Sequence, residues 1–322
     1  MSSPSLPSAA AAAAHAPKSA EEEQQSLSWG RLPQETILDI VASVPEFDFA
    51  MLRNLQLVDR RMHATLKAYE RSLCKGYATK QLLSIIPCFP DLAPPLCGSC
   101  QDVGCASGLS FKLLAEIQHR FQTVTIITDQ VFKFAPVCCC VLGWRPLFEA
   151  GMLLLYRLHE RSDYNDKVSF MTSMPLNALV AIFITLAQSL RAAQNGGIGL
   201  IHHDHEPEDP SVRSDVHLVF EDLTLLIGPE FVRHTLNHDE RADQALRYQV
   251  AMLDEVQMNG QDGTPPRKSL ISQLKRAFSN QAGCRIGEVM SKAMAHARKQ
   301  PLRDLDRAGI ARLVRFDDGV KS

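Results

Sequence analysis

The chain has 322 residues, with 34 basic and 36 acidic side chains and a formal net charge of −2. Because the charges nearly cancel, there is no overall basic field, and neither nucleic acid nor an anionic membrane surface is a favoured partner. Nine cysteines without a secretory signal favour a reducing compartment with free thiols. We therefore expect a cytoplasmic or nuclear protein with one large or two medium domains.

Residues 1–28 are rich in alanine, serine and proline and contain the acidic run Glu21-Glu22-Glu23. The alanines favour helix locally, but no apolar residues follow on which such a helix could pack. A disordered tail is therefore predicted for this stretch.

The first folded unit is predicted to begin at Leu32. Pro33 suits the first position of a helix, where its missing N–H costs nothing. Ile37 and Val41 then repeat at helical spacing. Pro45 ends this helix, because the residue before a proline disfavours the α conformation.

Two aspartates divide the next apolar run into helices. Asp48 is a good N-cap for a second helix, and Asp59 can cap a third, so that the run to Tyr77 is broken in two. A unit of about 45 residues cannot bury so much apolar surface by itself. We expect it to leave an apolar helical face that docks onto another protein.

These residues resemble an F-box in its fungal form. The matching residues are Leu32, Pro33, Glu35, Ile37, Leu38, Ile40, Asp48, Leu52, Leu55, Leu57, Val58, Arg60 and Arg61. One departure is Met62, where the family often has Trp or Phe, and a flexible thioether can fill the same gap. The resemblance covers about one seventh of the chain, and an ordinary helical hairpin within a larger core is the alternative.

The resemblance implies a substrate-recognition subunit of an SCF-type cullin–RING ubiquitin ligase. Such a chain binds the Skp-type adaptor of the cullin complex and an unknown protein substrate, and it holds a substrate lysine near the ubiquitin carrier. It implies no enzymatic chemistry and no cofactor. The expected adaptor-binding residues are Leu32, Pro33, Ile37, Leu38, Ile40, Leu52, Leu55, Leu57 and Val58. Some of these must form the internal core instead.

The rest of the chain is also predicted to be helical. The third helix is expected to continue to about Ile86 and stop at Pro87, followed by a loop over 88–110. The apolar spacing over 111–134 favours helix, although its β-branched residues could form a strand. Helices are predicted over 142–159 and 176–193. The second of these is too short for the roughly 20 apolar residues that span a bilayer, so a buried core helix is expected.

The C-terminal third alternates helices with polar loops. A loop is predicted over 201–211, helix or strand over 215–227, and helices over 229–238, 239–256 and 269–295, with a short one after Pro301. Residues 258–268 form a Gly/Pro linker, which is expected to be mobile. No leucine-rich, WD or kelch repeat is present. The prediction is thus an all-α protein: tail 1–28, F-box 29–78, a larger irregular helical domain 79–300 and tail 301–322.

Three groups of residues contain metal-ligand types. Cys97 and Cys100 have zinc-ligand spacing, with Cys105 and the run 138–140 further on, but adjacent cysteines do not form a second ligand pair. Buried thiols are the better interpretation. The loop over 202–206 contains three histidines, and His234 and His238 lie one turn apart without a Glu-x-x-His pattern. No metal site is predicted from these groups.

Motifs for phosphate binding and nucleophilic catalysis are absent. The glycines over 196–199 lack the third glycine of a dinucleotide fingerprint, and no Walker-type motif or nucleophile elbow occurs. Two alternatives to the ligase subunit stay open. One is a non-catalytic F-box scaffold that acts outside protein degradation, and the other is a zinc-stabilised helical domain.

Overall fold

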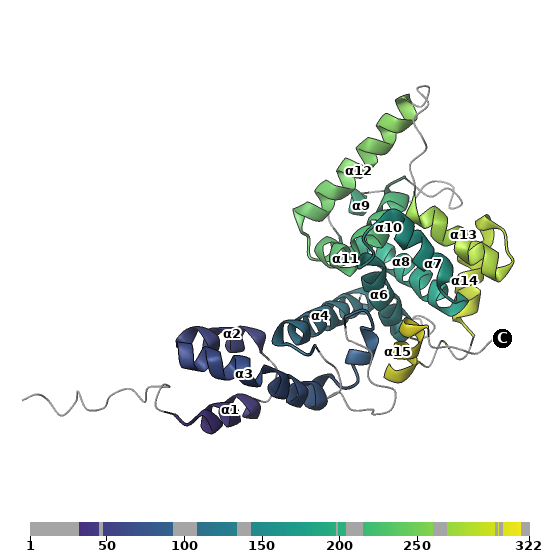
Figure 1. Cartoon of the computed structure of the whole chain (residues 1–322). Coiled ribbons are helices and arrows are strands. Elements are labelled where there is room, and N and C mark those ends of the chain that lie inside the picture. Colours follow the sequence, from purple (N-terminus) through teal and green to yellow (C-terminus); the bar gives the residue numbers. More distant parts are fainter. Residues whose placement is uncertain are drawn as a thin grey trace, which may run out of the picture. The chain divides into compact units, whose positions relative to one another are not determined.

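The computed structural model describes the residues 32–44, 48–92, 108–133, 143–197, 199–203, 215–259, 269–299, 302 and 305–316. Within these ranges the chain forms fourteen α-helices and no β-strand, so the predicted all-α class is confirmed (Figure 1). The predicted tail 1–28 and residues 260–268 of the predicted linker lie outside the described ranges.

The α-helices are α1 (Gln34–Ser43), α2 (Phe49–Val58), α3 (Arg60–Tyr77), α4 (Phe111–Lys133), α6 (Arg145–His159), α7 (Tyr164–Ser173), α8 (Leu176–Gly196), α9 (Leu200–His203), α10 (Asp215–Ile227), α11 (Pro229–Leu236), α12 (Glu240–Asn259), α13 (Leu270–Ala282), α14 (Val289–Ala297) and α15 (Arg307–Arg315). Shorter helical turns are η3 (Ala78–Leu82), η4 (Ile86–Cys88) and η6 (Ile286–Glu288).

The contacts within the chain divide it into two compact units. The N-terminal unit comprises Met1–Val44 and Ala50–Ala68, and the large unit comprises Pro45–Phe49 and Tyr69–Ser322. The division falls inside α3, whereas the sequence prediction placed a domain boundary at residue 78.

The helices of the N-terminal unit begin close to where the capping residues predict. Asp48 directly precedes α2, and the predicted break at Asp59 is confirmed, because Oδ1 of Asp59 accepts a hydrogen bond from the N–H of Met62 at 2.7 Å. Pro33 was predicted at the first helical position and lies one residue earlier, at the N-cap. Its carbonyl still accepts a hydrogen bond from the N–H of Ile37 at 3.2 Å.

The prediction of a continuous helix from α3 to Ile86 is wrong. The α-helix ends at Tyr77 and is followed by the π-helical turn η3 and then, after a short turn, by the 3₁₀ turn η4, which contains Pro87. A proline has no N–H to continue the α-helical hydrogen bonds, so the change to a tighter turn at η4 is expected.

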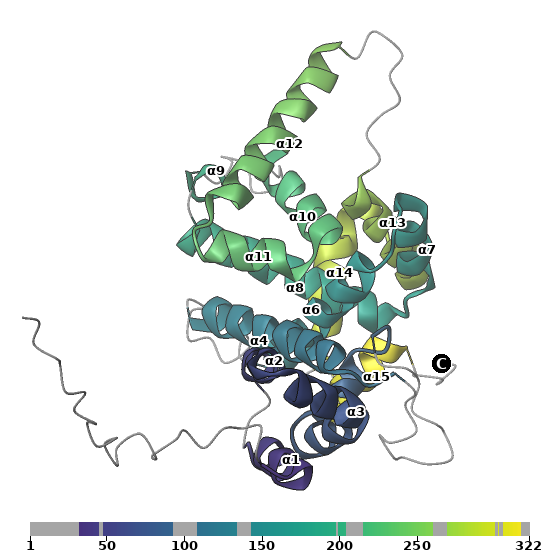
Figure 2. The same ribbon diagram turned by 60° about the vertical axis from the view of Figure 1, so that its left-hand side comes forward.

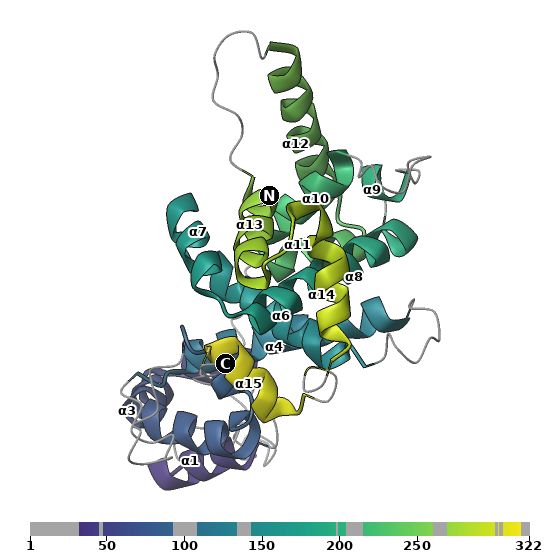
Figure 3. The same ribbon diagram turned by 90° about the vertical axis from the view of Figure 1, so that its right-hand side faces the viewer.

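Helix α8 is the centre of the large unit and packs against α6, α11, α13 and α14, as Figures 2 and 3 show. Fourteen of its residues are buried, which confirms the predicted core helix. The helix is long and apolar enough to cross a membrane by length and composition, but 78% of its most apolar window is buried inside the protein. Core helices of globular proteins share these properties.

At two glycines the backbone lies so close to atoms of α8 that no side chain would fit. A Cβ on Gly151 of α6 would lie 2.0 Å from Oγ1 of Thr185 and 2.5 Å from the carbonyl oxygen of Ala181, so only glycine lets α6 lie this close. Gly197, which ends α8, has ordinary negative φ, but a Cβ there would lie 2.4 Å from the carbonyl oxygen of Ala193. The glycine after this helix is therefore required by space and not by a left-handed backbone.

Two ambiguous segments prove helical, and two helices were missed. Residues 111–133 and 215–227 form α4 and α10 and not strands. Helix α7 was not predicted, although Asp163 caps it by accepting a hydrogen bond from the N–H of Asp166 at 2.8 Å. The short helix α9 overlaps the start of the predicted loop over 201–211.

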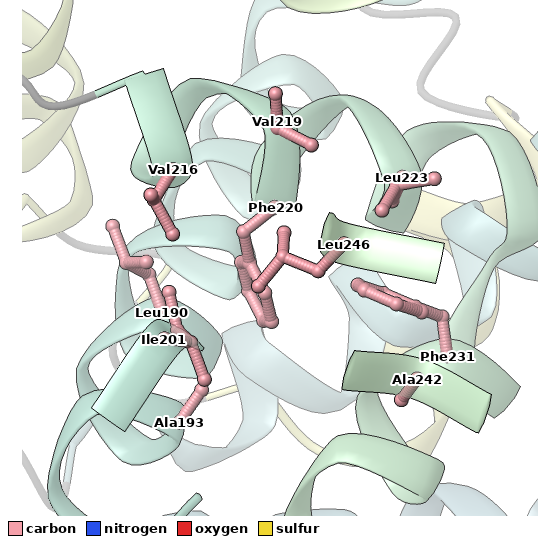
Figure 4. Close-up of a cluster of buried hydrophobic side chains, with 10 residues drawn as sticks. All are labelled: Leu190, Ala193, Ile201, Val216, Val219, Phe220, Leu223, Phe231, Ala242 and Leu246. Carbon is pink, nitrogen blue, oxygen red and sulfur yellow. The ribbon is translucent and has the colours of Figure 1, made fainter. Parts of the chain in front are cut away.

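A cluster of buried side chains joins α8 to the helices that follow it (Figure 4). Its members come from α8, α9, α10, α11 and α12 and are Leu190, Ala193, Ile201, Val216, Val219, Phe220, Leu223, Phe231, Ala242 and Leu246. The turn from α10 to α11 passes through Gly228, whose φ of +87° favours glycine, and Pro229 then starts α11 as predicted.

Candidate docking surface

The candidate functional site lies on α1 and α2 of the N-terminal unit. Of the nine residues predicted to bind an adaptor, Ile37 and Leu52 are each only 1% exposed. They are therefore core residues, and the prediction that placed them on the docking surface is corrected. Residues of the N-terminal unit buried with them are Val41, Met62, Thr65 and Leu66.

Helical periodicity explains which residues are buried. Ile37 and Val41 are four residues apart on α1, and Met62 and Leu66 are four residues apart on α3, so each pair occupies one face of its helix. Met62, the position at which the chain departs from the family pattern, is 1% exposed. Its flexible thioether thus occupies a buried position, as expected.

The remaining seven residues are partly or fully exposed. Leu32, Leu38 and Leu55 are half-buried, and Pro33, Ile40, Leu57 and Val58 are exposed. We call these seven residues the docking surface.

The most exposed apolar residues of the docking surface end α2. Leu57 is 75% exposed and Val58 is 51% exposed, while Ile40 of α1 is 39% exposed. Fully burying one such side chain contributes about 1.5–3 kcal/mol. Adjacent exposed leucine and valine side chains are therefore a favourable contact for an apolar partner.

The residues that follow give the docking surface a charged border. Asp59 ends α2 and caps α3, and Arg60 and Arg61 in the first turn of α3 are exposed. An apolar centre with a polar border is the usual composition of a protein–protein interface, in which arginine is enriched. The cap at Asp59 also fixes the backbone where Leu57 and Val58 are exposed.

The cysteines that were considered as zinc ligands lie outside the described ranges, namely Cys97, Cys100, Cys105 and 138–140. The described thiols of Cys74 and Cys88 are buried and free. Burial, followed by the nearby Glu70, raises the pKa of Cys74 to about 12, and burial raises the pKa of Cys88 to about 11. Both therefore remain protonated and unreactive at neutral pH.

The histidine groups give no metal site within the described residues, where no three ligand-type side chains converge. Nδ1 of His202 lies 2.9 Å from the carbonyl oxygen of Gln194, and 204–206 lie outside the described ranges. The predicted pairing of His234 and His238 on one helix face is wrong. Helix α11 ends at Leu236, and His238 has φ of +61° in the following turn.

A polar cluster that the sequence did not indicate joins α4, α6 and α11. The carboxylate of Glu230 accepts hydrogen bonds from the hydroxyl of Tyr156 at 2.9 Å and from Nε of Arg233 at 2.7 Å, and Nε2 of His119 lies 3.4 Å away. Burial alone would raise the pKa of Glu230, but these hydrogen bonds and positive charges outweigh it, so the pKa lies below 4.5. Burial, then the charge of Glu230, raises the pKa of Tyr156.

A second cluster joins α6 to α15. The guanidinium of Arg157 donates to Oδ2 of Asp91 at 2.7 Å and to the carbonyl oxygen of Val314. The same group lies 5.0 Å from the ring centre of Phe170 and 4.8 Å from that of Phe316. Both clusters connect residues far apart in the sequence, so no local motif could have revealed them, and both serve to tie helices together.

Comparison of the chain with models of protein families, with curated proteins and with solved structures finds no match.

Proposed function

We propose that the chain is the substrate-recognition subunit of an SCF-type cullin–RING ubiquitin ligase. In this proposal the docking surface binds the Skp-type adaptor, and the large unit binds a protein substrate. The observation that carries the proposal is the exposure of Leu57 and Val58 at the end of α2. These residues lie within the stretch that resembles an F-box, which begins with Leu32 and Pro33 directly before α1.

The proposed role requires binding and positioning, and the chain performs no bond chemistry. A substrate held on the large unit is kept near the ubiquitin carrier, so its lysines react at a high effective concentration. The docking surface needs only to bury apolar area against the adaptor while Arg60 and Arg61 remain at its border.

The experiment is co-elution of the full-length chain with the purified Skp-type adaptor on a sizing column. The wild type is expected to form a one-to-one complex, and Leu57→Glu is expected to abolish it, because the variant buries a carboxylate in an apolar contact. Leu226→Glu is the matched control, since Leu226 on α10 is also exposed, at 46%, but lies in the large unit. Equal binding by wild type and Leu57→Glu would contradict the proposal.

Adding the cullin separates a ligase subunit from a scaffold. A complex of chain, adaptor and cullin is expected for the ligase subunit. A stable complex with the adaptor that excludes the cullin would instead support an F-box protein acting outside degradation.

A further inference from the structure

A groove of about 640 Å³ crosses the large unit where α8, α10, α13, η6 and α14 meet. Figure 3 shows these helices from the side on which α14 is closest to the viewer. The buried side chains of Phe183 and Val289 line it, and so do more exposed residues. The groove is independent of the docking surface, which belongs to the N-terminal unit.

One side of the groove is apolar and adaptable. Ile286 of η6 is 53% exposed, and Met290 and Met294, four residues apart on α14, are half-buried. Methionine side chains are flexible and polarisable, and they adjust to different apolar partners. An exposed isoleucine beside two methionines is therefore suited to a partner's apolar side chains.

The charge at the groove has one sign. Of the twelve described residues that line it, Arg191 of α8 and Lys275 of α13 are cationic and none is Asp or Glu. Neither cation forms an ion pair with another described residue. Acidic side chains on a partner would complement these two charges.

The length of the groove fits a short helix. Its lining residues on α8 run from Phe183 to Gln194, which corresponds to about 16 Å, or three helical turns. A partner helix of about three turns would present apolar side chains at positions i, i+3 or i+4, and i+7 to such a groove. Acidic residues beside this apolar stripe would face Arg191 and Lys275.

We propose that this groove binds an amphipathic helix with acidic residues flanking its apolar face, supplied by another protein. That this protein is the ligase substrate rests on the proposed function, whereas the binding of the helix does not. The ligase would then recognise its substrates by a helical segment and not by a modified residue.

The probe is a phage-displayed library of random peptides of about 16 residues, selected on the immobilised full-length chain. Enriched peptides are labelled and titrated by fluorescence anisotropy. We expect apolar residues at helical spacing flanked by Asp or Glu. Ile286→Glu, which places a carboxylate at an exposed position of the groove, should weaken binding at least about tenfold. Arg191→Glu with Lys275→Glu should weaken it several-fold, and replacing the acidic residues of the peptide by lysine should restore binding to this variant.

Leu226→Glu is the control of similar exposure outside the groove, and binding to it should be unchanged. Circular dichroism of each variant establishes that it is folded. The inference is overturned if no peptide is enriched, if the enriched peptides are basic or lack helical spacing, or if Ile286→Glu binds them as the wild type does. A dimer of the free chain that Ile286→Glu dissociates would also overturn it, because a second copy would then occupy the groove.

The two proposals can fail separately. Ile286→Glu should keep adaptor binding, and Leu57→Glu should keep peptide binding. If the wild type binds no adaptor but binds peptides through the groove, the ligase role is refuted and the groove remains a helix-binding site.

Discussion

The two units of this chain bury apolar side chains to very different extents. In the large unit, α8 alone contributes fourteen buried residues and packs against α6, α11, α13 and α14. In the N-terminal unit, three helices bury a handful of side chains, while Leu57 and Val58 remain more than half exposed.

The apolar residues of the two units have different roles. A large unit can surround a helix on all sides, so nearly every apolar residue of α8 stabilises the fold. A small helical unit has too little volume for this, and the apolar residues left over are available for a partner. Substitutions of buried residues in the large unit should therefore lower the stability of the fold, whereas substitutions of the exposed apolar residues in the N-terminal unit should weaken binding.

The largest effect is expected for Phe148→Ala in α6. Phe148 is fully buried and meets Phe132 edge-on with ring centres 5.6 Å apart. The cavity should cost about 3–5 kcal/mol in the free energy of unfolding, measured by urea denaturation. Leu57→Ala should change it by less than about 0.5 kcal/mol. Similar losses in both variants would remove the distinction between the units.

The next effect tests the close approach of α6 to α8. Gly151→Ala would place a methyl group against the backbone of Ala181, so we expect a loss of about 1–3 kcal/mol or more. Gly76→Ala is the matched control, because no atom lies within 4 Å of a Cβ at that helical position. That control should stabilise by about 0.5–1 kcal/mol. A neutral Gly151→Ala would mean that the two helices separate easily.

A smaller effect is expected at the helix break of the N-terminal unit. Asp59→Ala removes the acceptor for the N–H of Met62 and should cost about 1 kcal/mol, with faster hydrogen exchange of the first amides of α3. Asp59→Asn keeps an acceptor and should preserve most of the protection. Unchanged exchange in Asp59→Ala would show that the cap is not needed.

The smallest effect is the pH dependence that Glu230 confers on the large unit. Its pKa is lower in the folded chain than the ordinary 4.5, so its interactions add stability above that pH and are lost as the pH falls through the folded pKa. The Tm of the wild type should therefore fall more steeply below about pH 4.5 than that of Glu230→Gln. Tyr156→Phe, which removes one of the hydrogen bonds, should give an intermediate slope. Parallel curves for all three would contradict the assignment.

Local sequence signals predicted most helices of this fold because they act over one or two turns. Asp59 and Pro229 each mark a helix start that the structure confirms. The missed helix α7 begins at the equally local cap Asp163, so a signal was available. The transition from α3 to η3 could not be predicted, since α3 contains no proline and Gly76 lies in its last turn without ending the helix.

The candidate site was predictable only in part. Periodicity located the apolar helices, but which residues face inward depends on how three helices pack, so Ile37 and Leu52 could not be separated from Ile40 and Leu57 beforehand. The groove depends on residues as distant as Phe183 and Met294, and no local pattern brings them together.

The most direct test of the central claim is hydrogen exchange of the full-length chain with and without the purified Skp-type adaptor. We predict new protection in peptides covering residues 32–58 and unchanged exchange in α6 and α8. Protection confined to the large unit, or none at all under conditions in which the chain is folded, would contradict the assignment of the docking surface to α1 and α2.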